Sequence, residues 1–289
     1  MTFDALRKEG IKRLQAAGIE DAHIDAAALM EAAGGPDITH FPLVRDEEVP
    51  EGVVFMFDAY IGVRANRIPL QHILGEAWFR GLSFTVDEDV LIPRQDTETL
   101  VEAVLREAAK YPGAPSLLEL CTGSGAIAVS LAREGNFASV TASDISHEAI
   151  QIARENAAKN GVEERILFAE GDLFRARTKS DKSLSRRSYD IICANPPYIP
   201  TAEIETLEPE GRDHDPLIAL DGGTDGLDFY RRLAKESAAH LNAGGKILLE
   251  IGCEQGAAVQ EIFAQAGWKD GLVEQDLAGK DRVFSAAKP

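Results

Sequence analysis

From residue 116 onward, short apolar runs alternate with helix-length segments, and this alternation restricts the possible folds more than any other feature. Strands are expected at residues 117–121, 139–142, 166–169, 189–194, 246–251, 272–275 and 283–286. The segments between several of them carry N-cap residues, apolar residues at helical spacing and terminal glycines, which predicts helices. Strands joined through helices form a parallel sheet covered on both faces. The sequence therefore predicts an α/β domain.

The chain before this domain has a different pattern. Residues 1–75 show apolar residues near helical spacing and no strand alternation, which predicts a small helical bundle. Residues 76–95 contain Trp78, Phe79 and Phe84 around Gly81, a pattern typical of a β-hairpin. We therefore expect a helical domain over residues 1–75, a hairpin linker over residues 76–95 and the α/β domain over residues 96–289.

Composition argues against several classes of protein. The formal net charge of −18 disfavours nonspecific binding to nucleic acid, because like charges repel the phosphate backbone. The 3 cysteines are widely spaced and form no CxxC pair, so neither a disulfide framework nor a metal site is expected. The N-terminus is charged where a signal peptide would be apolar, and no apolar run is long enough to span a bilayer. These features predict a cytoplasmic protein.

Polar and glycine residues follow the first three predicted strands. In residues 121–125, Gly123 and Gly125 let the backbone approach a ligand closely, and the next helix N-terminus favours an anion such as a carboxylate. Asp144 ends the second strand, where an acid typically binds ribose hydroxyl groups. Asp172 follows the third strand and could bind an adenine amino group, or be a surface turn residue. The glycine spacing would also pass as a dinucleotide-binding fingerprint, so a nicotinamide-dependent dehydrogenase is an alternative.

The most specific motif is Asn195, Pro196, Pro197 and Tyr198, directly after the fourth strand. Two successive prolines provide no backbone N–H, so their carbonyl groups can only accept hydrogen bonds. The Asn195 side-chain oxygen is a further acceptor, and the Tyr198 ring could stack on a planar group. The motif therefore suits a planar –NH2 group, as in an amide or an exocyclic amine. The dehydrogenase alternative explains neither this motif nor Asp172.

These motifs resemble those of S-adenosylmethionine-dependent methyltransferases that act on amide or exocyclic amino nitrogens. The whole chain resembles the protein-(glutamine-N5) methyltransferases of peptide chain release factors, the PrmC/HemK family. The resemblance extends to residues 71–76, 90–94, 219–228 and 248–252. The chain departs from the usual family pattern at Cys121, where glycine is usual, at Glu119, where aspartate is usual, and at Gln95, where proline is usual.

The resemblance implies a class I methyltransferase fold, which is Rossmann-like with a mostly parallel sheet, preceded by a helical bundle that docks the protein substrate. It implies S-adenosyl-L-methionine as cofactor, S-adenosyl-L-homocysteine as product, and methylation of the glutamine in the GGQ motif of class-one release factors by a monomeric enzyme. The implied catalytic residues are Asn195, Pro196 and Tyr198, and Pro197 joins them in binding the substrate. The implied cofactor-binding residues are Glu119, Cys121, Thr122, Gly123, Ser124, Gly125, Asp144, Ile145, Asp172, Leu173 and Asn195.

Three alternatives remain at this level. The substrate could be a ribosomal protein, since Cys121 within this glycine motif also occurs in the sister enzymes. It could be an adenine of nucleic acid, or the chain could be a non-enzymatic binding module. Residues 201–230 carry nine acids against Arg212, which predicts an acidic surface that repels nucleic acid and suits a basic protein segment. Residues 175–188 carry six basic residues and one acid, and a solvated, mobile loop is expected there.

Overall fold

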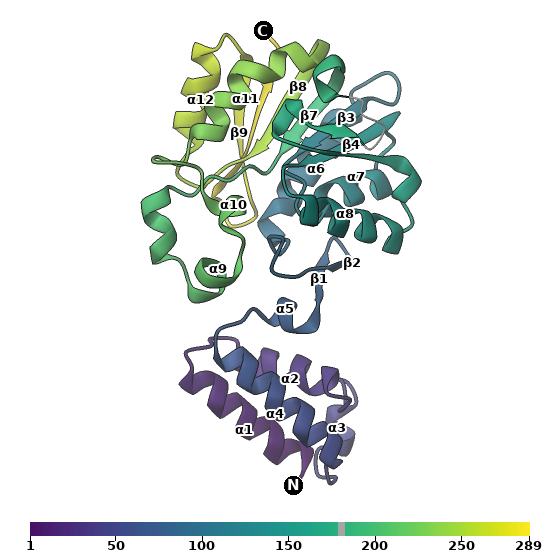
Figure 1. Ribbon diagram of the computed structural model, residues 1–289, viewed down its shortest axis with the longest axis vertical. Helices are drawn as coiled ribbons and strands as arrows, with labels where there is room; N and C mark the ends of the chain where they lie inside the picture. The colour runs from purple at the N-terminus through teal and green to yellow at the C-terminus, as the bar shows by residue number, and fades with distance from the viewer. Residues whose placement is uncertain (179–182) are drawn as a thin grey trace. The chain divides into compact units, whose positions relative to one another are not determined.

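The computed structural model describes residues 1–178 and 183–289 and divides the chain into two compact units (Figure 1). The first unit contains Met1–Gly75 and also Glu208–His214, and the second contains Glu76–Leu207 and Asp215–Pro289. The hairpin is thus part of the second unit. The sequence pattern gives no sign that residues 208–214 join the first unit, because their partners lie far away along the chain.

The first unit is a helical bundle. Its helices are α1 (Phe3–Ala16), α2 (Ala22–Ala32), α3 (Phe41–Val44), α4 (Glu51–Ala65), α5 (Leu70–Leu74) and the distant α9 (Pro209–His214). The three long helices α1, α2 and α4 pack against one another. Leu14, Leu29 and Ile61 are completely buried between them and form the centre of an apolar core. Thr2 caps α1 by accepting a hydrogen bond from the Ala5 N–H.

Arginines of α4 and the turn after it bind α9 within this unit. Arg64 Nε lies 2.7 Å from Asp25 Oδ2, and Arg64 Nη1 lies 2.9 Å from Glu210 Oε1. Arg67 Nη2 contacts the other Glu210 oxygen at 2.6 Å. Arg64 and Asp25 are buried, so their charges need each other as partners. These ion pairs hold residues 208–214 against the other helices of the first unit.

The predicted hairpin is confirmed as β1 (Glu76–Phe79) paired antiparallel with β2 (Leu82–Thr85). It is fixed to α8 (His147–Lys159) by side-chain hydrogen bonds. Asn156 Oδ1 accepts from the Thr85 N–H at 2.7 Å, and Asn156 Nδ2 donates to the Thr85 carbonyl at 2.9 Å. The hairpin therefore has a defined place on the α/β unit.

The second unit is built on an eight-stranded sheet of order β6-β5-β4-β3-β7-β8-β10-β9. The central strands β5, β4, β3, β7 and β8 are parallel, while β6, β10 and β9 pair antiparallel with their neighbours, so the mostly parallel sheet is confirmed. The strands are β3 (Ser116–Leu120), β4 (Ser139–Asp144), β5 (Ile166–Glu170), β6 (Arg177–Thr178), β7 (Tyr189–Ala194), β8 (Leu241–Glu250), β9 (Lys269–Gln275) and β10 (Asp281–Ala287).

Helices cover both faces of this sheet (Figure 1). On one face, Leu117 and Ile191 pack with α6 (Glu98–Ala108), α7 (Ala126–Glu134) and α8. On the other, Leu118 and Ile192 pack with α11 (Asp228–Glu236) and α12 (Gly256–Gln265). Because side chains alternate along a strand, both faces of the central strands are apolar. Short helices complete the unit: α10 (Leu217–Leu220) and the 3-10 helices η1 (Gln95–Thr97), η2 (Glu163–Arg165), η3 (Leu173–Arg175), η4 (Leu184–Arg186), η5 (Thr201–Thr206) and η6 (Ser237–His240).

At residues 175–188, where a solvated loop is expected, the described basic residues Arg175, Arg177 and Arg186 are exposed, but the backbone is not irregular throughout. Strand β6 pairs with β5, and η4 follows it. Ala176 and Leu184 are completely buried, so this segment contributes to the core despite its many basic residues. Its residues 179–182 lie outside the described residues. Among the described helices, none combines the length and the apolar character that crossing a membrane requires.

Candidate active site

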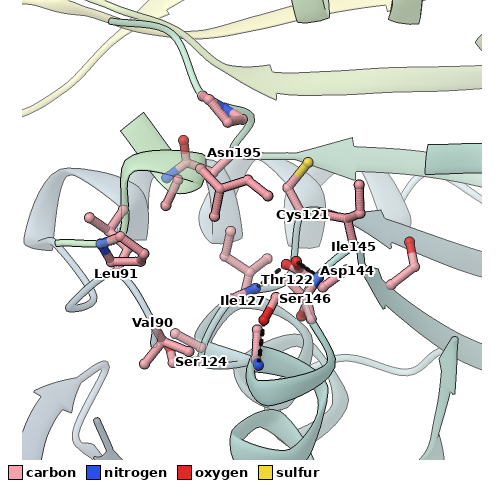
Figure 2. Close-up of a pocket in the computed structure, with 18 of the residues that line it drawn as sticks. Val90, Leu91, Cys121, Thr122, Ser124, Ile127, Asp144, Ile145, Ser146 and Asn195 are labelled. Carbon is pink, nitrogen blue, oxygen red and sulfur yellow. Dashed lines mark hydrogen bonds between the residues drawn. The ribbon is translucent and has the colours of Figure 1, made fainter. Parts of the chain in front are cut away.

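The loops at the carboxyl ends of β3, β4, β5 and β7 line one cavity (Figure 2). In this sheet β3 lies between β4 and β7, so the connections diverge there, and α/β sheets bind ligands at such a point. The cavity brings together most of the site residues that the sequence predicts, namely Cys121, Thr122, Gly123, Ser124, Asp144, Ile145, Asp172, Leu173, Asn195 and Pro197.

The turn between β3 and α7 needs its glycines for two different reasons. Gly123 and Gly125 have φ angles of +52° and +80°, which glycine adopts more easily than other residues. A Cβ atom at Gly125 would lie 3.0 Å from the Ala153 Cβ, so this glycine also allows α8 to pack closely. A Cβ at Gly123 would meet no atom within 4 Å. Cys121 has a φ of +58°, which agrees with the family's usual glycine at this position.

Asp144 is held by backbone groups on two sides. Its Oδ2 accepts from the Gly123 N–H at 2.9 Å, and its Oδ1 accepts from the Ser146 N–H at 3.0 Å (Figure 2). Burial raises the pKa of Asp144 although these hydrogen bonds oppose the shift. A carboxylate oxygen can accept more than one hydrogen bond, so this rigidly held group can still bind hydroxyl groups of a ligand.

Asp172 is paired with an arginine that the sequence analysis missed. Arg232 Nη2 lies 2.6 Å and 2.7 Å from the two Asp172 oxygens. Both residues line the cavity. No local motif marks Arg232, because α11 brings it to Asp172 from 60 residues further along the chain.

The residues after β7 divide between the cavity and the core. Asn195 lines the cavity, and its Nδ2 lies 3.5 Å from the Thr97 Oγ1. The Tyr198 side chain instead packs against the core beside α11 and α12, and burial raises the pKa of Tyr198 to about 12. The Tyr198 carbonyl accepts from Gln255 Nε2 at 2.9 Å. The backbone after Pro197 is therefore fixed by contacts of Tyr198 with the core and with Gln255.

Four predicted site residues do not line the cavity within the described structure: Glu119, Gly125, Pro196 and Tyr198. Glu119 lies one layer deeper and is completely buried. Its Oε2 accepts from the Thr122 hydroxyl at 2.6 Å, so its carboxyl group supports a residue that lines the cavity. Burial raises the pKa of Glu119 to about 8.

The opposite wall of the cavity was given no role in the sequence analysis. Val90 and Leu91 lie across the cavity from Ile145 (Figure 2), and Pro216, Ile218, Ala219 and Phe229 add further apolar surface. Arg94, which also lines the cavity, pairs with the buried Asp215 at 2.8 Å. The motif at residues 90–94 was the available signal for part of this wall. The sequence did not show that residues 90–94 form this wall, because the residues that complete it, around Asp215, follow β7 in the chain.

The acidic surface expected over residues 201–230 is weaker than a local count suggests, because arginines from several elements pair with six of its nine acids. The pairs are Arg67–Glu208, Arg64–Glu210, Arg212–Asp213, Arg94–Asp215, Arg231–Asp225 and Arg231–Asp228. Most of these arginines lie outside the segment, so a local charge count could not include them. The charge of this segment is therefore a weaker guide to the substrate than the sequence alone suggests.

The donor and acceptor groups of the cavity fit a nucleoside that carries a charged amino-acid group. Asp144 offers an acceptor for ribose hydroxyls, and Ile145 and Leu173 offer apolar surface for a base. The glycine turn leaves open space at Gly123 in front of the α7 N-terminus, where a carboxylate is favoured. Among the described residues, no cluster of histidine, cysteine and acidic side chains could hold a metal ion.

Comparison with known proteins identifies the family. Residues 5–75 match the PrmC N-terminal domain and residues 95–207 match the methyltransferase small domain. A release factor glutamine methyltransferase of Geobacter sulfurreducens is 40% identical over 266 residues, covering 92% of this chain and 89% of the relative. One of Cereibacter sphaeroides is 41% identical over 286 residues, covering 99% and 98%.

A solved structure confirms the predicted Rossmann-like methyltransferase fold. It is a methyltransferase from Pyrococcus furiosus with a TM-score of 0.50 and 19% identity, covering 73% of this chain and 90% of that one. At this level of identity the likeness concerns the fold alone. The full-length sequence relatives carry the assignment further, and this chain belongs to the release factor glutamine methyltransferase family.

Proposed function

We propose that this enzyme methylates the side-chain amide nitrogen of the glutamine in the GGQ motif of class-one release factors, in the cytoplasm where translation occurs. The observation that carries the proposal is the place of Asn195, an amide acceptor on the wall of the same cavity as Asp144 and the glycine turn. The names of the full-length relatives favour a release factor over a ribosomal protein or an adenine as substrate.

The cofactor is S-adenosyl-L-methionine, which supplies a methyl group on a positively charged sulfur. Asp144 would bind the ribose hydroxyls, and the backbone N–H groups of the glycine turn would bind the carboxylate. Ile145 and Leu173 would enclose the base. The Asp172 carboxylate is oriented by Arg232 and would accept a hydrogen bond from a cofactor amino group.

The reacting nitrogen of a glutamine is a poor nucleophile, because its lone pair is delocalised into the adjacent carbonyl group. The Asn195 side-chain oxygen would accept a hydrogen bond from one of its two N–H groups. The Pro196 carbonyl, on the backbone between the cavity-lining Asn195 and Pro197, would accept from the other and so hold the nitrogen in place. Positive charge develops on the nitrogen as it is methylated, and both hydrogen bonds then strengthen. The methylated nitrogen is acidic and loses one proton to water, so no strong general base is required.

Two variants separate the proposed roles. Asn195→Ala should bind the cofactor with nearly unchanged affinity and lose turnover by roughly a hundredfold, the typical effect of removing one electrostatic group from a site. Asp144→Ala should instead weaken cofactor binding, because the ribose hydroxyls lose their acceptor. Titration calorimetry with S-adenosyl-L-homocysteine measures binding, and methyl transfer to a purified release factor measures turnover. Turnover of Asn195→Ala within a few-fold of the unmodified enzyme would remove Asn195 from the mechanism.

A further inference from the structure

Glu250 is a buried carboxyl group beside Asn195 that the proposed chemistry does not use. It is the last residue of β8, and its relative exposure is only 2%. Strand β8 runs parallel to β7 with Leu249 opposite Ala194, so Glu250 and Asn195 are neighbours at the same edge of the sheet. Acidic side chains are rarely buried to this extent unless they have partners.

The partners of Glu250 connect it to Asn195. Thr97, on η1, is itself buried, and its Oγ1 lies 3.5 Å from the Asn195 Nδ2. Both the Thr97 and the Asn195 side chains act on the Glu250 carboxyl group, because each of them lowers its pKa. The Glu250 Oε2 atom has no hydrogen-bond partner among the described residues. Glu250, Thr97 and Asn195 therefore form one small polar cluster, of which Thr97 and Asn195 also line the cavity.

Charged and titratable groups of other elements face this cluster. Arg282 on β10 pairs with Asp96 at 3.0 Å and with Asp276 at 3.1 Å. The pKa of Glu250 is raised to about 7, mainly by burial and to a smaller extent by the Asp96 charge. The Thr97 and Asn195 side chains and the Arg282 charge oppose this rise. The hydroxyl groups of Tyr198 and Tyr230 have raised pKa values through burial and stay neutral near pH 7. Glu250 thus changes its charge near neutral pH.

The orientation of the Asn195 amide decides whether it can act as an acceptor. A side-chain amide has an NH2 end that donates and an oxygen end that accepts. An ionised carboxylate only accepts, so it binds the NH2 end and leaves the oxygen free. The Thr97 hydroxyl oxygen accepts from the Asn195 NH2 group at 3.5 Å, which leaves its own hydrogen available for the Glu250 carboxylate. Both neighbours therefore select the same orientation of the amide.

We propose that Glu250 is a positioning residue which, together with Thr97, turns the Asn195 side-chain oxygen toward the substrate amide. This role rests on the proposed function of Asn195. Protonated Glu250 has an O–H donor that competes for the Asn195 oxygen, so kcat should fall as the pH drops below about 7. Glu250→Gln also brings a donor to the Asn195 oxygen at every pH.

The first test compares Glu250→Gln with Glu107→Gln, a buried glutamate of α6 that pairs with Lys110 and Lys246 outside the cavity. Glu250→Gln should lower kcat by roughly tenfold or more, because the Asn195 oxygen is no longer held toward the substrate. The kcat of this variant should also no longer fall as the pH drops below about 7. Its affinity for S-adenosyl-L-homocysteine and its thermal midpoint should stay close to those of the unmodified enzyme. Glu107→Gln should keep both kcat and the profile. An unchanged kcat with a retained acidic fall in Glu250→Gln would overturn the proposal.

The second test needs no turnover and no stable variant of Glu250. The side-chain NH2 resonances of Asn195 are identified in a nitrogen–proton spectrum by their loss in Asn195→Ala. In the unmodified enzyme they should shift with a midpoint near pH 7, and resonances that stay constant between pH 5.5 and 8.5 would overturn the proposal. Failure of the unmodified enzyme to methylate a release factor would instead count against the proposed function, while this titration would still decide the role of Glu250.

Discussion

Cys121 shows how one backbone angle selects a residue. Its φ of +58° lies in the left-handed region, where side chains without β-branching are tolerated and β-branched ones are strained. The sequence analysis noted only that the family usually has glycine there, and the angle supplies the physical reason. The Cys121 side chain offsets part of this backbone strain, because it packs against the apolar core beside β7 and β8, which a glycine could not do.

This explanation makes a prediction about two substitutions at Cys121. Cys121→Gly should have a free energy of unfolding within about 1 kcal/mol of the unmodified protein, because relief of strain offsets lost packing. Cys121→Val should be less stable by about 1–3 kcal/mol, because its side chain is strained at this φ. Urea unfolding measures both values. Equal stability of the two variants would contradict the role assigned to the angle.

Single residues were predictable where the chain itself carries the signal. Asp144 and Asn195 each follow an apolar strand, so the sequence placed them at one edge of the sheet, and the structure brings both to one cavity. Thr97, Arg232 and Glu250 were not assigned a role, because their partners come from other elements. Tyr198 has the same local signal as Asn195, yet its ring packs into the core, since only tertiary structure decides which way a side chain turns.

At the scale of elements, the β3–α7 turn and α8 are fitted to each other. Because Gly125 has no Cβ, α8 can pack closely against the turn. A Cβ at this position would lie only 3.0 Å from the Ala153 Cβ of α8. Gly123 has a similar positive φ without such a contact. The two glycines can therefore be compared directly, because both have a positive φ but only Gly125 packs closely against a helix.

Gly125→Ala should consequently destabilise the protein more than Gly123→Ala. Both variants carry the cost of a positive φ, of order 1 kcal/mol, and Gly125→Ala adds the cost of moving α8, about 1–3 kcal/mol. Chemical unfolding without cofactor gives the difference. A larger loss in Gly123→Ala would show that helix packing is not what Gly125 provides.

The longer elements were predicted well, because apolar spacing and caps are local. The hairpin, the central strands and helices such as α8, which Ser146 caps, agree with their sequence patterns. The short β6, α9 and α10 were not predicted. Each spans only a few residues, so no period is visible, and each is stabilised by neighbours from elsewhere in the chain.

At the scale of the whole molecule, the chain forms the helical unit from two separate segments. The ion pairs of Arg64 with Asp25 and Glu210 connect the segments inside that unit. The pairs of Arg64 with Glu210 and of Arg67 with Glu208 also explain why a charge count over residues 201–230 alone is a poor guide to the surface, since these arginines lie outside that segment.

Arg64→Ala should destabilise the helical unit by about 3–5 kcal/mol, because it leaves the buried Asp25 without its partner. Arg67→Ala, at a more exposed position, should cost about 1 kcal/mol or less. Hydrogen exchange with mass spectrometry reports on this unit separately, and amides of α2 and α4 should lose protection in the first variant only. Similar protection in both variants would mean that the buried charge pair is not needed for stability.

The central claim is the transfer of a methyl group to a glutamine of a release factor. The most direct measurement incubates the enzyme with a purified release factor and isotopically labelled S-adenosyl-L-methionine, and maps the label by peptide mass spectrometry. The account predicts one methyl group on the side-chain amide of the GGQ glutamine, formed roughly a hundredfold more slowly after Asn195→Ala. Label on a ribosomal protein or on nucleic acid, with none on the release factor, would contradict it.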